Sequence, residues 1–279
     1  MNMAVGRIGS IFVFLVLLVL SAGRLSADEH HAFERWHGQD ERSAMWIDHA
    51  AWEEFLLHYL RPGRDGVHRV AYGDVTDRDR SQLSGYVDAM GEVDITGYRR
   101  SEQVAYWINL YNALLVKMVL DHYPIASIRK LERLDTGSKS SPWNRPLIVK
   151  QGVALSLNDI EHRILKPIWD DPRLHYAITC AAVGCPNLQP TPFTGSQLDQ
   201  QLSDAAMAYV NDPRCIAIEN GELHVSSLYR WNLQSFGGSE RGVIQHLMAY
   251  AEPDLAMSLQ AFDRLHGDRF DWRLNDAAR

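Results

Sequence analysis

The spacing of hydrophobic and polar residues divides the chain into helical and extended segments. Apolar residues at helical spacing predict helices over residues 45–60, 77–90, 101–122, 157–165, 196–211, 239–250 and 253–260. Short alternating runs predict strands at 67–72, 147–149, 153–156, 215–219, 222–226 and 269–274. Helical crossovers cannot connect all of these strands. The pattern therefore predicts an α+β fold, with helices packed on a small, mainly antiparallel sheet.

The longest periodic segment, residues 101–122, is apolar on nearly all sides, which is typical of a buried helix. Asn109 and Asn112 interrupt it and, three residues apart, share one face. Buried amides need hydrogen-bond partners. Two interpretations stay open: the amides fix loop backbone against the core, or one of them orients a catalytic histidine or donates to an oxyanion.

The segment 171–186 is the most promising place for chemistry. It opens with the turn residues Asp171-Pro172, continues through a β-branched apolar run, and ends in small residues, Gly184 and Pro186. This pattern predicts a buried strand that delivers Cys180 to a tight loop. The segment also places His175 and two of the three cysteines of the chain within eleven residues.

The N-terminal pattern predicts export. Arg7 precedes an apolar run at residues 11–20, and small residues follow up to Ala27. These are the parts of a signal peptide, here residues 1–27, cleaved after Ala27 or, alternatively, after Gly23. The run is shorter than the ~20 residues of a membrane span, although an uncleaved anchor is the alternative. We therefore expect a periplasmic or secreted protein without a membrane span after cleavage.

Composition limits the classes of partner that the protein can bind. The net charge of −7 and the pI of about 5.9 argue against nucleic-acid binding, which needs a basic stripe. The chain is 46% hydrophobic and 23% charged, which suits one globular domain over residues 45–279, preceded by a loosely ordered polar segment at 28–44. No motif predicts a cofactor. The oligomeric state stays open.

A thiol-dependent hydrolase of amide or peptide bonds is one hypothesis. It needs a thiolate, a base, an orienting group and oxyanion donors. Cys180 is the candidate nucleophile, and His175 or His162 is the candidate base. On a regular strand His175 and Cys180 point to opposite faces, so either a bulge intervenes or His162 is the partner. Glu161 and Asn109 are candidate orienting residues.

The backbone of residues 181–184 belongs to the same hypothesis. All four residues, Ala181 to Gly184, have small or compact side chains. Their amides could therefore approach a substrate closely and serve as oxyanion donors.

Other functions compete with catalysis. Export permits a structural Cys180–Cys185 disulfide in a non-catalytic envelope domain that binds a peptide or small-molecule ligand. A redox disulfide is less favoured, because thiol oxidoreductases usually have two residues between the cysteines. A metal site from Cys180, Cys185, His175 and His162 is the third alternative. With three cysteines one thiol is left over, and Cys215 is predicted to be a small core residue.

Four segments resemble one known family. Residues 103–113, 157–165, 171–186 and 270–275 are similar, in this order, to motifs of the DUF547 family. The resemblance extends over about residues 45–275 and implies fold kinship more than an activity, since the family is of unknown function. Ser235-Phe236 departs from an Asp-Phe pair frequent in the family. A fainter likeness to papain-like folds rests on a buried helix followed by a histidine-bearing strand, but the helix lacks a cysteine at its start.

Overall fold

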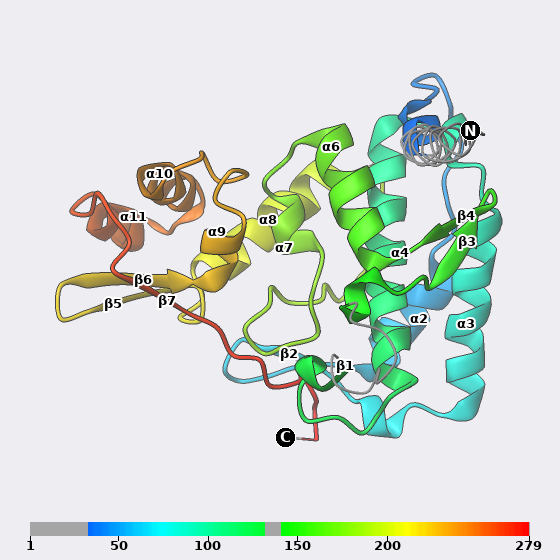
Figure 1. Cartoon of the computed structure of the whole chain (residues 1–279), viewed down its shortest axis with the longest axis horizontal. Coiled ribbons are helices and arrows are strands. Elements are labelled where there is room, and N and C mark those ends of the chain that lie inside the picture. Colours follow the sequence, from blue (N-terminus) through cyan, green and yellow to red (C-terminus); the bar gives the residue numbers. More distant parts are fainter. Residues whose placement is uncertain (1–32, 132–140, 279) are drawn as a thin grey trace, which may run out of the picture.

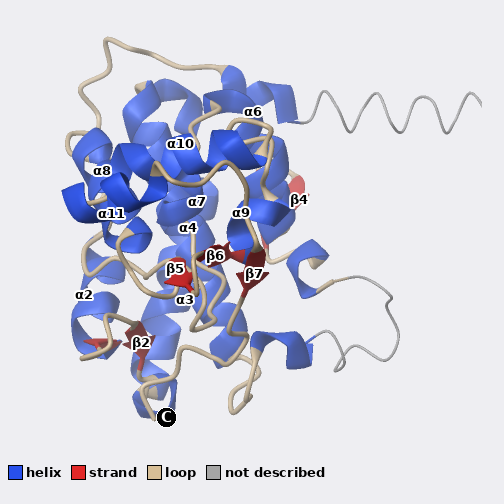
Figure 2. Ribbon diagram, turned by 90° about the vertical axis from the view of Figure 1, so that its left-hand side faces the viewer, coloured by secondary structure: helices blue, strands red, loops and turns tan. Residues whose placement is uncertain are grey.

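The computed structural model describes residues 33–131 and 141–278, so the predicted signal peptide lies outside the described residues. The predicted α+β class is confirmed. Within these described ranges, the strands are short pieces set among helices and form three separate small sheets, where the sequence predicted one (Figure 2). Two hydrophobic cores lie next to each other, and helices α7 (Leu174–Ala177) and α8 (Leu198–Val210) contribute side chains to both (Figure 1).

The first core surrounds helix α4 (Arg100–Leu120), which is buried nearly all round, as its sequence predicts. Helices α2 (Ala50–Tyr59) and α3 (Asp77–Glu92) pack beside it, at the right of Figure 1. Two antiparallel hairpins complete this half: β1 (Leu60–Pro62) with β2 (His68–Val70), and β3 (Ile148–Lys150) with β4 (Val153–Leu155). A continuous apolar surface explains why α4 occupies the centre, since any exposed face would leave apolar area in water.

The N-terminal residues of the described chain are attached to this core. Trp36 is fully buried, and its ring centroid lies 5.4 Å from that of Trp107 in α4. Burial of a tryptophan ring removes a large apolar area from water. The polar composition of residues 28–44 did not anticipate this contact.

The second core is built from the later part of the chain. It combines α8, α10 (Glu240–Tyr250) and α11 (Pro253–Leu259) with a sheet of order β5-β6-β7. Strands β5 (Ile216–Glu219) and β6 (Glu222–Ser226), both predicted, form an antiparallel hairpin, whereas β7 (Gly267–Arg269) pairs parallel to β6. Asn220 and Gly221, between β5 and β6, both have positive φ, as a type I′ turn requires. Cys215 is buried in this core, as predicted.

One local prediction is wrong. Residues 174–177 form helix α7 instead of the expected strand. Leu174 and Ala177 pack in the first core while Tyr176 packs in the second, so burial on two sides removed the polar positions that distinguish a helix from a strand. Trp231, at the end of helix α9 (Ser227–Trp231), is 52% exposed.

The C-terminal segment is only partly the strand that its alternation predicts. After β7 it continues as an extended chain with isolated bridges from Arg273 to Ser127 and from Leu274 to Ala182. It therefore crosses from the second core to the first, beside the loop that follows α7 (Figure 1).

Candidate functional site

A cleft of about 380 Å³ contains four of the five candidate residues. Glu161 and His162 come from a π-helical segment, Asp159–Leu165, while His175 comes from α7 and Cys180 from the loop that follows it. The remaining lining residues come from several segments of the chain: Tyr111, Ser141, Trp143, Asn158, Ile178, Thr179, Pro186, Leu228, Trp231, Asn232, Phe270 and Trp272. Sequence reasoning therefore identified side chains that the fold does bring together.

The π-helical segment begins with a reciprocal cap. The backbone N–H of Ser156 donates to Asp159 Oδ2 at 2.9 Å, and the N–H of Asp159 donates to Ser156 Oγ at 3.1 Å. Such caps satisfy the free amides of a helix start. The helix continues directly into α6 (Lys166–Trp169). π-Helical turns are rare in proteins, and those that occur often lie at functional sites.

The charges on this helix neutralise one another. Lys166 Nζ lies 2.8 Å from Glu161 Oε1 and also donates to Asn232 Oδ1 at 3.0 Å. His162 Nε2 lies 3.9 Å from the same Glu161 oxygen. Burial, opposed by Glu161 and assisted by the charge of Lys166, lowers the pKa of His162. Glu161 therefore already has partners, which limits its use as an orienting group for His175.

His175 is buried, with its ring centroid 5.1 Å from that of Phe236. Burial lowers its pKa to about 3, and the nearby positive groups Lys166, His162 and His246 act in the same direction. A thiolate–imidazolium pair needs a protonated ring. At neutral pH His175 is neutral, so it is a hydrogen-bonding group rather than the cationic partner of a thiolate.

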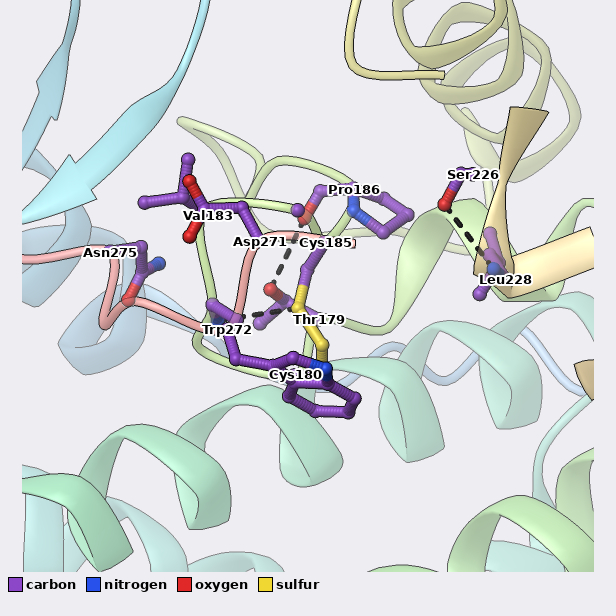
Figure 3. Close-up of a disulfide and its surroundings, with 12 residues drawn as sticks. Thr179, Cys180, Val183, Cys185, Pro186, Ser226, Leu228, Asp271, Trp272 and Asn275 are labelled. Atoms are coloured by element: carbon purple, nitrogen blue, oxygen red, sulfur yellow. Dashed lines mark hydrogen bonds between the residues drawn. A yellow bond between two sulfur atoms is a disulfide. The ribbon is translucent and has the colours of Figure 1, made fainter. Parts of the chain in front are cut away.

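The cysteines of the central segment are joined. Cys180 and Cys185 form a disulfide with their Cα atoms 5.7 Å apart, and Trp272 lies beside it (Figure 3). Cys180 is half-buried and lines the cleft, whereas Cys185 is buried. In this form Cys180 carries no thiol. Its catalytic role stays a prediction that requires reduction of the bond.

The backbone amides expected to face a substrate have other partners. The N–H of Val183 donates to the carbonyl of Arg273 at 2.8 Å, and that of Gly184 donates to the carbonyl of Asp271 at 2.9 Å. The N–H of Ala182 donates to Cys185 Sγ at 3.2 Å. An oxyanion hole needs donors aimed at the reacting oxygen. These three amides are therefore not oxyanion donors in this conformation.

Asn109 is the candidate that the fold keeps out of the cleft. Its side chain donates to the carbonyl of Phe193 at 2.8 Å and accepts from the N–H of Phe193 at 3.0 Å. Asn112 makes the same pair of bonds one turn later, to the carbonyl of Ala177 at 2.9 Å and from the N–H of Thr179 at 3.0 Å. Both amides fix loop backbone, and the role of Asn109 as an orienting residue is corrected accordingly. Asn112 is closer to the chemistry, since it holds the backbone directly before Cys180.

Sequence reasoning missed an aromatic surface at the cleft, which we call the aromatic shelf: Trp231, Phe270 and Trp272. Their ring centroids lie 4.6–5.4 Å apart. Phe270 and Trp272 are two positions apart, a spacing that puts both side chains on one face of an extended segment. That spacing was the available signal, but nothing in the sequence linked it to Trp231.

A metal site finds no support in the described ranges, 33–131 and 141–278. No three His, Cys, Asp or Glu side chains there are grouped to hold a metal ion. The two cysteine sulfurs of the proposed ligand set are bonded to each other. Within the same ranges, no helix has the length and apolar character needed to cross a membrane.

The fold and site together define an α+β protein with an aromatic-lined cleft beside a disulfide. Residues 95–210 match the family model described as "Protein of unknown function, DUF547". The predicted DUF547 kinship is confirmed over this segment, which includes α4, the π-helical segment and both cysteines of the disulfide. The similar segment at 270–275 lies outside the match. Comparisons with curated proteins and with solved structures found no match.

Proposed function

We propose that this chain is an exported binding domain that takes a peptide or small-molecule ligand in its cleft. The observation that carries the proposal is the aromatic shelf, where Trp231 is 52% exposed although its ring contacts Phe270 and Trp272. Ligand sites are concave and apolar, with a few polar groups that fix orientation. The cleft combines this shelf with Asn158, Glu161 and other polar side chains.

The state of the central loop favours binding over catalysis. The sulfur of Cys180 is in a disulfide, and neighbouring amides are bonded within the chain. Burial keeps His175 neutral, with a pKa of about 3. A ligand would therefore meet apolar rings and satisfied polar groups, which suit recognition without bond cleavage.

The test is a thermal-shift screen of short peptides and metabolites against the mature protein and two variants. Trp231→Ala removes the most exposed ring of the shelf. Trp46→Ala is the matched control, because Trp46 is 71% exposed and does not line the cleft. Compounds that stabilise the protein should lose that effect in Trp231→Ala and keep it in Trp46→Ala. Stabilisation that is equal in both variants would place binding elsewhere.

A thiol-dependent hydrolase is the second candidate, favoured by one observation: Cys180, His175, His162 and Glu161 all line the same cleft. The chemistry requires prior reduction, since only a thiolate attacks. After reduction, Cys180 should then alkylate with iodoacetamide at pH 6–7 faster than Cys185 and Cys215. Replacement of both His162 and His175 by Gln should slow the reaction of Cys180 and leave only the advantage that its access to the cleft gives. A reduced Cys180 no more reactive than Cys215 would remove this candidate.

A further inference from the structure

We propose that Cys180–Cys185 is an exchangeable disulfide, and that a thiol-bearing ligand in the cleft forms a mixed disulfide with Cys180. The proposal goes beyond the binding function, because it gives the cleft a reaction and a substrate class. It does not depend on the shelf being the recognition surface.

Access is unequal for the two sulfurs. Cys180 lines the cleft and is half-buried. Cys185 is 1% exposed and does not line it. Thiol–disulfide exchange depends on which sulfur a thiolate can reach. An incoming thiolate can therefore reach Cys180 Sγ from the cleft, whereas Cys185 is shielded.

The sulfur that would leave has a hydrogen-bond donor. The N–H of Ala182 donates to Cys185 Sγ at 3.2 Å. When Cys185 is released as a thiolate, this bond becomes charge-assisted and stronger, which offsets part of the cost of burying the charge. The incoming thiolate forms an S–S bond to Cys180 Sγ, the Cys180–Cys185 bond breaks, and its electron pair stays on Cys185. A second thiolate at the mixed disulfide releases the oxidised ligand dimer and the Cys180 thiolate.

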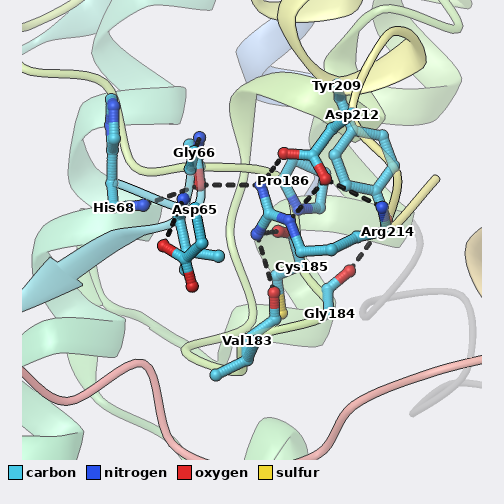
Figure 4. Close-up of polar contacts among 12 residues, drawn as sticks. Asp65, Gly66, His68, Val183, Gly184, Cys185, Pro186, Tyr209, Asp212 and Arg214 are labelled. Carbon is cyan, nitrogen blue, oxygen red and sulfur yellow. Dashed lines mark hydrogen bonds and ion pairs between the residues drawn. The ribbon is translucent and has the colours of Figure 1, made fainter. Parts of the chain in front are cut away.

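The loop between the cysteines is held by bonds that do not involve the disulfide. Thr179 Oγ1 donates to the carbonyl of Pro186 at 3.1 Å and closes the ends of the loop. Arg214 Nη1 donates to the carbonyl of Val183 at 2.7 Å, and the hydroxyl of Tyr209 donates to the carbonyl of Gly184 at 2.7 Å (Figure 4).

These contacts keep the two sulfurs adjacent after reduction. A high effective concentration of one thiol near the other favours reformation of the bond. We therefore expect a reversible couple rather than a disulfide that is lost on reduction.

Reduced glutathione is the probe for the first test. The oxidised protein, incubated with it under native conditions and quenched in acid, should show glutathione on Cys180 by peptide mass spectrometry. When free reduced glutathione is removed, the Cys185 thiolate should attack Cys180 Sγ of the adduct, release glutathione and restore the intact disulfide. Fully reduced protein should need oxidised glutathione to reach the same state. Adducts mainly on Cys185, or reduction that occurs only in denaturant, would overturn the proposal.

A matched pair of variants gives an independent test. Cys185→Ser leaves Cys180 free, and Cys180→Ser leaves Cys185 free, with buried Cys215 present in both. A buried thiol reacts only through local opening. Cys180 should therefore react with a chromogenic aryl disulfide on the order of 100-fold faster than Cys185. Equal rates in the two variants, or unfolding of the reduced wild type by circular dichroism, would show a purely structural bond.

Discussion

The two sides of the cleft differ in how their side chains are held. Glu161 and Lys166 pair with each other at 2.8 Å, and His175 is buried beside Phe236. The aromatic shelf is held by contacts between its rings and by Arg129, whose guanidinium carbon lies 5.4 Å from the Trp272 ring centroid, and it leaves half of Trp231 in solvent. On the first side Glu161 and Lys166 pair with each other and His175 packs against Phe236, whereas the shelf leaves apolar area available to a ligand. In this cleft the ionisable side chains are therefore used within the folded chain, and the aromatic side chains offer the surface for recognition.

The largest expected effect is acid destabilisation through the polar side. His175 has a folded pKa of about 3, below the ordinary value of 6.5, because of burial and nearby positive charge. Above pH 6.5 the ring is neutral in both states. As pH falls from 6.5 to 3, His175 binds a proton in the unfolded chain but not in the folded chain. The free energy of unfolding therefore falls by roughly 4 kcal/mol.

Urea denaturation at pH 7.5, 5.5, 4.5 and 3 measures this loss. His49 and His246, whose pKa values burial lowers to about 4, contribute in the same direction. His175→Gln removes one of the three histidines and should flatten the pH dependence without abolishing it. A profile identical to that of the wild type would show that His175 titrates normally.

The next effect separates two buried amides with similar bonds. Asn112→Leu and Asn109→Leu each leave one backbone N–H and one carbonyl buried without a partner, which costs about 2–3 kcal/mol. Melting temperatures of both variants should fall by a similar amount. Only Asn112→Leu should also change the reactivity of Cys180, because only Asn112 bonds to Thr179. A change in Cys180 reactivity in both variants would mean that both substitutions disturb the whole fold and not only the loop at Thr179.

Reduction of the disulfide should cost less. The ring it closes has a sequence separation of 5, and chain-entropy arguments give about 2 kcal/mol for so short a loop. The reduced protein should therefore melt roughly 4–8 °C lower and stay folded. Calorimetry with and without reductant measures the shift, with Cys215→Ser as a control that leaves the disulfide intact. A fall of 20 °C in melting temperature would mean that the disulfide, and not the hydrogen bonds, holds the loop.

The smallest effect concerns the shelf itself. Trp231→Ala should change the free energy of unfolding by less than about 1 kcal/mol, since the side chain is half exposed. By contrast, Trp36→Ala should cost about 3–5 kcal/mol, because Trp36 is fully buried. Denaturant unfolding of the two variants compares the free energy that a buried packing ring and an exposed shelf ring contribute. Similar costs would mean that Trp231 is a packing residue after all.

The strongest local patterns predicted the fold best. Helix α4 and the β5–β6 hairpin follow from continuous apolar composition and from Asn220-Gly221, both of which act within a few residues. Helix α7 was missed because its side chains enter two cores, and burial on both sides erases periodicity. The exposure of Trp231 could not be predicted, because a lone aromatic residue in a loop-rich segment carries no information about its surroundings.

The site was predictable where its residues were close in sequence. Glu161 with His162, and His175 with Cys180, were found from short segments, and the cleft brings the two pairs together. The shelf joins Trp231 to a segment beginning at Phe270, a contact that only the tertiary fold creates. Asn109 and Asn112 shared every local signal, and their different roles depend on which loop passes each one.

The C-terminal extended segment has a consequence for when the cleft forms. Its carbonyls at Asp271 and Arg273 accept from Gly184 and Val183, and its rings complete the shelf. Every other lining residue of the cleft is translated before Phe270. A growing chain that has reached only residue 260 therefore has both cysteines but neither the acceptors that position their loop nor most of the shelf. During biosynthesis the cleft is among the last parts of the molecule to mature, and premature oxidation of the cysteines would occur in a loop that these contacts do not yet hold.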